Sequence, residues 1–208
     1  MARQKKGLLL VVSGPAGVGK GTVNAALMAR HPEIKMSVSA TTRKPRPGEI
    51  DGVHYFFKTQ EAFLEMIESD AFLEYMHVFG MNYYGTPKSF VESERCKGNH
   101  VILEIDVQGA AKVKEKCPDA VLIFIAPPSL RILKDRLVGR GTETQESIDV
   151  RTKTALDELN KLPDYDYMVI NDVVEEAVAE MEAIITAELC RTDRNNDLIT
   201  KLTGGETI

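Results

Sequence analysis

The residues with the plainest chemical potential form a glycine-rich turn close to the start of the chain. The run Gly14-Pro15-Ala16-Gly17-Val18-Gly19-Lys20 follows an apolar stretch and precedes a segment with helical spacing. Glycines let successive backbone N–H groups turn inward around phosphate oxygens, and a helix N-terminus and a lysine add positive charge. This order therefore predicts a loop that binds nucleotide phosphates. The plainer alternative is a strand-to-helix turn with a surface lysine.

The hydroxyl after the lysine is displaced by one position. A common phosphate loop has Ser or Thr directly after the lysine, where it binds Mg²⁺, whereas this chain has Gly21 and then Thr22. Lys-Gly-Thr resembles the loop of adenylate kinases and some of their relatives. We therefore expect Thr22 to contact a donor phosphate, and Mg²⁺ to be held partly through water.

A second group of phosphate-binding side chains follows the loop along the chain. Arg43 and Arg46 are three residues apart, with the Ser39 hydroxyl before them and the Tyr55 phenol after them. An isolated segment of this kind is better interpreted as a solvated basic loop before a β-hairpin. Beside a phosphate loop, however, these groups could surround a second phosphate with charge-assisted hydrogen bonds.

Apolar runs and helical patterns alternate along the chain, and these elements must position the chemistry. Runs bounded by turn residues predict buried strands at Leu8–Val12, Val101–Ile105, Val121–Ala126 and Met168–Ile170. Three-and-four spacing predicts helices over Thr22–Ala29, Phe90–Lys97, Val107–Lys116, Leu130–Val138, Ile148–Leu162 and Val174–Leu189. This alternation indicates an α/β fold with a parallel, doubly wound sheet flanked by helices. Ser129 is a natural N-cap, and Pro87 suits the first helical position behind Thr86.

Residues 37–86 interrupt this alternation. They contain short strand-like pieces at Ser37–Ala40, Tyr55–Phe57 and Phe72–His77. We expect a small α+β insertion here, on a core formed by residues 1–36 and 87–208. Within the core, residues 139–144 have the glycine content of a mobile lid over about 136–150. The polar tail from Arg191 is expected to fray.

Composition limits the classes of protein to consider. The chain has 208 residues, 43% hydrophobic and 27% charged, an ordinary balance for a globular protein rather than a disordered chain or a rod. Its net charge of −5 gives no general attraction for nucleic acid. Three widely spaced cysteines indicate neither a disulfide framework nor a zinc site. No apolar run is long enough for a signal peptide or a membrane span, so a cytoplasmic location is expected.

From about Leu8 to about Ile185 the chain resembles the guanylate kinase family. The likeness rests on several blocks in the expected order, which are the phosphate loop, Ser37-Val-Ser-Ala-Thr-Thr-Arg-x-x-Arg-x-Gly-Glu49, Phe72-Leu-Glu-Tyr75, Asn82-Tyr-Tyr-Gly-Thr86, Leu103-Glu-Ile-Asp-Val-Gln-Gly109, Ile125-Ala-Pro-Pro-Ser129, Gly139-Arg-Gly-Thr-Glu-Thr144 and Ile170-Asn-Asp172. Each block alone is weak, but together they are specific. The resemblance implies a P-loop core, an acceptor-binding insertion and a lid that carries arginines.

The resemblance also implies roles on the acceptor side. Contacts to the phosphate of GMP fall on Ser39, Arg43, Arg46, Tyr55 and Tyr84, contacts to its base on Glu74 and Thr86, and a position near the nucleoside on Asp106. A carboxylate can accept both N–H groups on one edge of guanine. The plainer alternatives are an exposed strand glutamate for Glu74 and helix caps for Thr86 and Asp106. Glu104, two residues before Asp106, points to the same face.

On the donor side the resemblance implies contacts with ATP along the loop and beyond it. Those residues are Gly14, Pro15, Ala16, Gly17, Val18, Gly19, Lys20, Gly21, Thr22 and, near adenine, Asn171. Lys20, Arg136, Arg140 and Arg151 are the expected catalytic cations, although solvated arginines are also common at helix C-termini. Thr22 and Asp106 would meet Mg²⁺ indirectly, through water.

The expected activity is phosphoryl transfer from ATP·Mg²⁺ to GMP, with both nucleotides as small-molecule substrates and a homo-oligomer left open. Three alternatives remain at this point. They are a kinase of another small acceptor, a guanylate-kinase-like module that binds phosphopeptides without catalysis, and a regulatory GTPase. A regulatory GTPase would need an Asn-Lys-x-Asp block to bind the base, and this sequence has none.

Overall fold

The computed structural model describes residues 6–78, 80–138 and 145–204. A five-stranded parallel sheet crosses the molecule in the order β2-β7-β1-β8-β9. Its strands are β2 (Ile34–Met36), β7 (His100–Glu104), β1 (Leu9–Ser13), β8 (Val121–Ala126) and β9 (Tyr167–Ile170). The α/β fold with a parallel sheet flanked by helices is therefore confirmed.

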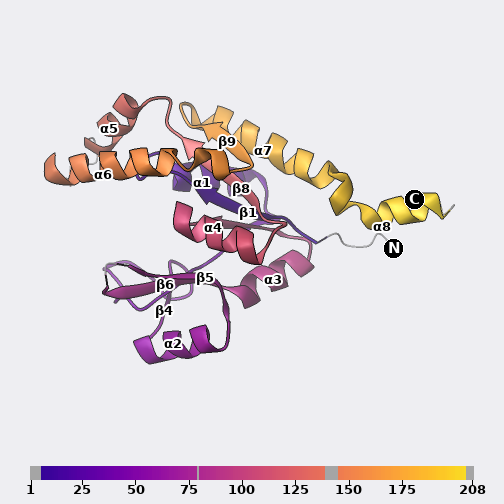
Figure 1. The fold of residues 1–208 in the computed structure, drawn as a ribbon, viewed down its shortest axis with the longest axis horizontal. Helices are drawn as coiled ribbons and strands as arrows, with labels where there is room; N and C mark the ends of the chain where they lie inside the picture. The colour runs from indigo at the N-terminus through magenta and orange to yellow at the C-terminus, as the bar shows by residue number, and fades with distance from the viewer. Residues whose placement is uncertain (1–5, 79, 139–144, 205–208) are drawn as a thin grey trace.

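The two faces of this sheet carry separate apolar clusters, because successive residues of a strand point to opposite sides. Leu8, Leu10 and Val12 belong to one cluster, and Leu9 and Val11 to the other. The first cluster is covered by α1 (Lys20–Arg30), α5 (Leu130–Val138), α6 (Gln145–Leu159) and α7 (Val174–Cys190), and the second by α3 (Lys88–Cys96) and α4 (Val107–Lys116), as Figure 1 shows. Both faces of β1 and β8 are buried, which explains their uninterrupted apolar sequences.

A second, four-stranded sheet projects below the first in Figure 1, in the order β4-β3-β6-β5. Its strands are β4 (Phe56–Phe57), β3 (Ala40–Thr41), β6 (Asn82–Pro87) and β5 (Phe72–Val78), and α2 (Gln60–Glu68) packs beside them. A small core of its own, built on the buried residues Ala40, Phe63 and Phe72, holds this sheet together. The Phe63 and Phe72 rings stack at 4.5 Å between centroids.

Several elements differ from the sequence predictions. Strands β2 and β6 and helix α2 were not predicted, residues 37–39 are not strand, and α6 ends at Leu159 rather than Leu162. Pro87 is the N-cap of α3 rather than its first helical residue, and Thr86 lies in β6, so its prediction as a helix cap is wrong. Ser129 does cap α5, because its Oγ accepts from Ile132 N at 3.2 Å.

In the described part of the chain no helix is long and apolar enough to cross a membrane.

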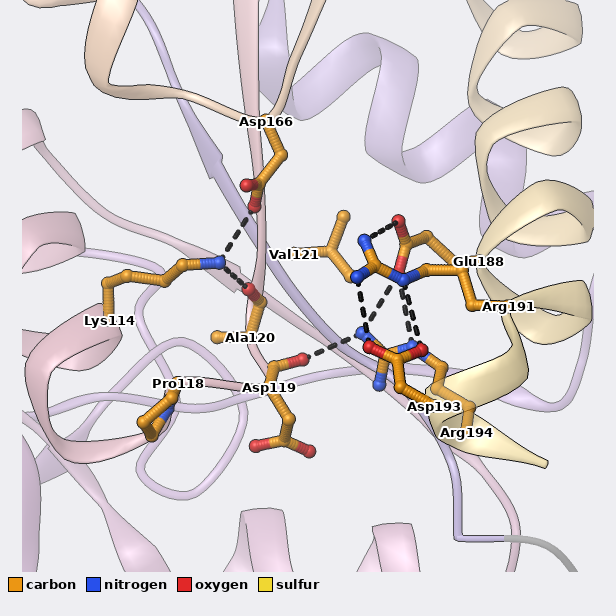
Figure 2. A pocket seen from close by; sticks show the side chains of 10 residues that line it. All are labelled: Lys114, Pro118, Asp119, Ala120, Val121, Asp166, Glu188, Arg191, Asp193 and Arg194. Atoms are coloured by element: carbon orange, nitrogen blue, oxygen red, sulfur yellow. Dashed lines mark hydrogen bonds and ion pairs between the residues drawn. The ribbon is translucent and has the colours of Figure 1, made fainter. Parts of the chain in front are cut away.

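The predicted fraying after Arg191 is also wrong for the described part of the tail, which forms η2 (Thr192–Arg194) and α8 (Asn196–Thr203). Figure 2 shows how this segment is held at a cavity of about 210 Å³. Buried Glu188 accepts from Arg194 at 2.9 Å and from the Tyr167 hydroxyl at 2.8 Å. Arg194 also donates to Asp119 O at 2.9 Å, which ties the tail to the start of β8.

This cavity lies at the amino-terminal edge of the sheet, beside the first residue of β8 and the residue before β9. Parallel sheets bind ligands at the opposite, carboxyl edge. The cations of the cavity are engaged with acids of the same cavity, for example Lys114 with Asp166 at 3.0 Å and Arg191 with Asp193 at 2.9 Å. We therefore assign the cavity to anchoring the C-terminal segment rather than to the chemistry.

Candidate functional site

The phosphate loop follows β1 at the carboxyl edge of the sheet, and its backbone can be formed only by glycine at the critical positions. Gly14, Gly17 and Gly19 have φ of +145°, +86° and +96°, a region that other L-residues rarely enter. A Cβ on Gly14 would lie 2.2 Å from Ile125 O, and one on Gly19 would lie 2.4 Å from Asn171 Nδ2. The loop leads directly into α1, which no side chain caps within the described residues. The first turn of α1 thus faces the loop as a set of backbone donors.

Lys20 is the first residue of α1 and bends back over the loop. Its Nζ donates to Gly14 O at 2.5 Å and to Pro15 O at 3.3 Å. The ammonium group is therefore already held at the position around which the loop turns. This geometry fits the phosphate-binding interpretation and not a surface lysine, since the side chain is half-buried.

Asn171 and Arg136 lie behind the loop and converge on one carbonyl. Asn171 Nδ2 donates to Val18 O at 2.7 Å, and Arg136 Nη1 donates to Val18 O at 3.4 Å and to Asn171 O at 2.9 Å. The Asn171 side chain is only 4% exposed. Its amide nitrogen thus supports the loop here, a contact that the expectation of an adenine partner did not include. Arg136 is likewise bonded to backbone carbonyls, so it lies beside the loop rather than over it.

The acceptor-side cations and phenols lie together on the second sheet. Arg43 Cζ lies 5.3 Å from the centroid of the Tyr55 ring, and the Tyr55 and Tyr84 rings meet edge to face at 6.0 Å. Arg43 is also paired with Glu49, whose Oε1 accepts from Nη2 at 2.8 Å. This pairing raises the pKa of Arg43 and lowers that of Glu49 to about 2. Arg46 is exposed on the same loop, and Ser39 is half-buried just before β3.

Glu74 is buried on β5, which contradicts its alternative as an exposed strand glutamate. Glu74 is only 6% exposed, and its Oε1 accepts a hydrogen bond from the Thr86 hydroxyl on β6 at 2.7 Å. Burial raises the pKa of Glu74. The two residues predicted to read a base are therefore in direct contact, and the carboxylate is held in an environment that favours a ligand with N–H donors.

Asp106 connects this pair to the main sheet. It follows β7 and caps α4, accepting from Gly109 N at 2.8 Å, so its alternative as a helix cap is confirmed as a structural role. A Cβ on Gly109 would lie 3.4 Å from Glu74 Oε2 and 3.5 Å from Asp106 Oδ1. The two carboxylates thus flank one glycine, where the second sheet meets the carboxyl edge of the first.

The donor set near the loop suits Mg²⁺ that is bound chiefly by phosphate and water. Thr22 is exposed at the start of α1, and Glu104 accepts from Asn24 Nδ2 at 2.9 Å. The described residues contain no group of three or more His, Cys, Asp or Glu side chains that could hold a metal ion. Mg²⁺ commonly keeps several waters and binds one or two protein groups plus substrate phosphates. The scattered hydroxyl and carboxylates fit that mode.

The lid arginines are only partly described. Arg140 lies outside the described residues, as do residues 139–144 of the predicted lid. Arg151 lies half-buried on α6. Most of the other predicted residues lie in two groups, one around the phosphate loop and one at the second sheet, and Asp106 at the start of α4 lies beside the second group.

Polar groups that the sequence did not single out also border this site. Glu158 on α6 and Tyr165 before β9 have side-chain oxygens that are buried without a hydrogen-bond partner among the described residues. Burial raises the pKa of Glu158 and raises that of Tyr165 to about 12. The charge of Lys20 acts in the opposite direction and favours the ionised form of Glu158. No sequence signal separates Glu158 from the other acids of its helix.

Comparisons with known proteins agree with this arrangement. The sequence model of the guanylate kinase family matches residues 6–188. The guanylate kinase of Caldanaerobacter subterraneus subsp. tengcongensis is 55% identical over 202 residues, which cover 97% of this chain and 98% of the relative. That of Clostridioides difficile is 51% identical over 195 residues, or 94% and 95% of the two chains. The crystal structure of guanylate kinase from Anaplasma phagocytophilum superposes with a TM-score of 0.74 at 33% identity, covering 95% of each chain.

The family match spans the phosphate loop, the second sheet and most of α7, so it covers both groups of site residues. The relatives are matched over nearly their whole length, which leaves no large part of their fold without a counterpart. The chain therefore belongs to the guanylate kinase family and is an ATP-dependent nucleoside monophosphate kinase.

Proposed function

We propose that the protein transfers the γ-phosphoryl group of ATP to the phosphate of GMP, giving ADP and GDP. The observation that carries the choice of acceptor is the buried Glu74 carboxylate, bonded to Thr86 and flanking Gly109 beside Asp106. A carboxylate in such a position needs N–H donors from its ligand. Guanine supplies two on one edge, whereas adenine supplies none there.

The proposed step needs positioning and charge more than covalent chemistry. An oxygen of the GMP phosphate attacks the γ-phosphorus in line, and the bond to the bridging oxygen of ADP breaks. The attacking oxygen of the GMP phosphate is already ionised, so no protein base is required. Lys20, the loop amides and the lid arginines stabilise the charge that spreads over the equatorial oxygens.

Mg²⁺ bound with ATP would supply positive charge beside the phosphates. Thr22 and Asp106 would hold its water shell, with the Glu104 carboxylate close to the start of α1. Residues 1–36 and 87–208 would bind the donor, and residues 37–86 the acceptor. The grouping of five residues at the second sheet supports their proposed place around the acceptor phosphate. They are Ser39, Arg43, Arg46, Tyr55 and Tyr84.

A coupled assay of ADP production by the purified protein tests this proposal. Coupled production of ADP should be fast with GMP and ATP·Mg²⁺ together and slow when GMP is omitted or replaced by AMP. A module that binds phosphopeptides would give no ADP in any of these reactions. A kinase of another acceptor would give ADP with that acceptor and not with GMP. Either result would overturn the proposed reaction.

The arginines of the second sheet should act on GMP alone. Arg43→Ala and Arg46→Ala should each weaken GMP by about tenfold or more, because each removes a charge-assisted bond to phosphate. ATP affinity should stay within about twofold. Separate titrations of the two nucleotides measure both effects. An equal loss of ATP affinity would remove these arginines from the acceptor site.

The raised pKa of Glu74 predicts how guanine binding depends on pH. The N–H donors of guanine bind the carboxylate, so binding must expel a proton below the pKa of the free protein. Guanosine affinity should be constant above that pKa and should fall by up to about tenfold per pH unit below it. Guanosine is the ligand of choice because the phosphate of GMP titrates near pH ~6 itself.

The matched control for this measurement is Glu74→Gln, which carries no titratable group and should give a flat profile. Glu49 is not a competing explanation, because its pKa of about 2 keeps it ionised over the working range. A flat profile for the parent protein would show that guanosine does not bind the Glu74 carboxylate.

A further inference from the structure

Glu49 lies on the loop between β3 and β4, which also carries Arg43 and Arg46, but it is not among the residues expected to touch a substrate. Its carboxylate accepts from Arg43 Nη1 at 2.9 Å and from Arg43 Nη2 at 2.8 Å, and Oε2 also accepts from Arg46 N at 2.7 Å. The Arg43 and Glu49 side chains are 15% and 17% exposed, so this pair is largely shielded from water. One carboxylate thus holds the side chain of one phosphate-site arginine and the backbone of the other.

The two Glu49 bonds use one particular edge of the Arg43 guanidinium. A guanidinium carries five N–H donors in a rigid fork. The Glu49 carboxylate accepts one N–H of Nη1 and one N–H of Nη2. The second N–H of Nη1 is accepted by Lys44 O at 2.8 Å. The Nε–H and the other Nη2 N–H take no part in these three bonds, and they lie side by side on the adjacent edge, with the Tyr84 hydroxyl as a further hydrogen-bond partner of Arg43. That edge can bind two oxygens of a phosphate at once.

The rings around Arg43 restrict it further. Its Cζ lies 5.3 Å from the Tyr55 ring centroid and 5.8 Å from that of Phe57, within range of cation–π attraction. Tyr84, which packs against Tyr55, also interacts with Arg43. The guanidinium is therefore held beside two neighbouring rings and at one edge by a carboxylate. Its remaining edge is oriented before any ligand arrives.

We propose that Glu49 is a positioning residue for the acceptor phosphate, which it serves by fixing the Arg43 guanidinium and the Arg46 backbone. This inference rests on the proposed function, in which GMP binds at the second sheet. Glu49 does not touch the nucleotide. Its effect comes from ordering a side chain that would otherwise lose several rotamers on binding.

Two effects oppose each other when Glu49 loses its charge. The Arg43 edge is no longer fixed, which weakens phosphate binding, and one negative charge near the phosphate disappears, which strengthens it. Glu49→Gln keeps the size of the side chain but turns an NH₂ group toward an Arg43 donor, so the pair is broken on that side. If orientation is the larger effect, this variant binds GMP more weakly than the parent.

The experiment compares GMP with guanosine, which has the same base and sugar but no phosphate. In Glu49→Gln, GMP should bind about tenfold more weakly, with guanosine and ATP affinities unchanged. Glu65→Gln, an exposed position on α2 of the same insertion, is the matched control and should leave all three unchanged. Equal or tighter binding of GMP would overturn the proposal. A parallel loss of guanosine would also overturn it, because Glu49 would then serve only the fold of the insertion.

A double-mutant cycle identifies Arg43 as the route. In an Arg43→Ala background, Glu49→Gln should change GMP affinity by less than about twofold, because the guanidinium is gone and the glutamine oxygen can still accept from Arg46 N. A full additive loss would contradict the proposed route through Arg43. These are binding measurements, so they remain decisive if the parent binds GMP but fails to phosphorylate it. In that case the proposed reaction would be wrong and the positioning role would stand or fall separately.

Discussion

Lys20→Met is expected to lower kcat by about 10² to 10³ while the protein stays folded. Losing one preorganised donor to a transition state commonly raises the activation free energy by about 2.7–4 kcal/mol. The Lys20 ammonium group is such a donor, because its bonds to Gly14 O and Pro15 O hold it in the loop. The glycine geometry of the loop does not depend on the lysine side chain. The melting temperature should therefore change little, and the methionine retains the apolar stem.

Steady-state kinetics with saturating ATP and GMP, together with a thermal melt, measure this effect. Lys153→Met, at an exposed position on α6, is the matched control and should keep parental turnover. Near-normal kcat in Lys20→Met with an unchanged melt would show that the loop does not act on the transferring group. A large fall in melting temperature would instead assign the lysine to the fold.

The second large effect concerns the choice between GMP and AMP, for which kcat/KM should differ by several orders of magnitude. Adenine presents an unprotonated nitrogen where guanine presents N1–H, and it has no 2-amine. The Glu74 carboxylate, already bonded to Thr86 at 2.7 Å, would face a lone pair instead of two donors. Sites built around a hydrogen bond reject analogues that lack it by about 10⁴–10⁵. Inosine monophosphate keeps N1–H without the amine and should fall between the two.

Glu74→Gln should narrow this gap mainly by harming GMP, because an amide accepts more weakly and offers only one oxygen. The Glu65→Gln protein again serves as control, since it makes the same change at an exposed site. Measured kcat/KM values for the three monophosphates decide the outcome. Unaltered discrimination in Glu74→Gln would mean that another group reads the base.

The main sheet could be predicted because its central strands are buried on both faces and so read as continuous apolar runs. The orientation of Glu74 could not. Simple alternation along a strand would put Glu74 on one face and its neighbours Leu73 and Tyr75 on the other. Instead Phe72, Leu73 and Glu74 are all buried, and Tyr75 is 38% exposed. The pairing of β5 with β6 shifts register between Phe72 and Glu74, and such an irregularity turns side chains to other faces. A single sequence carries no clear signal for that shift.

The site was predictable where residue type alone limits the chemistry, as in the glycines and lysine of the loop. It was not predictable where a role depends on distant partners. The hydrogen bond from Asn171 to Val18 O spans most of the chain, and the buried side-chain oxygen of Glu158 lies on a helix whose sequence does not set this acid apart from the others. Helix α2 was missed because it lies within a segment otherwise rich in short strand patterns.

The division of β5 between two cores bears on how such an enzyme could be re-engineered or diversify. Phe72 packs into the small core of the second sheet, and the next residue, Leu73, packs into the main core with Val91 and Ala110. The second sheet and α2 could therefore be exchanged as a unit between related chains, provided that the Leu73 contact and the bonds from Lys112 and Lys116 to β5 are matched at the seam. Because the small core shares no residue with the main clusters, and because we propose that the acceptor binds at the second sheet, such a graft should alter which nucleotide is accepted without rebuilding the phosphate loop.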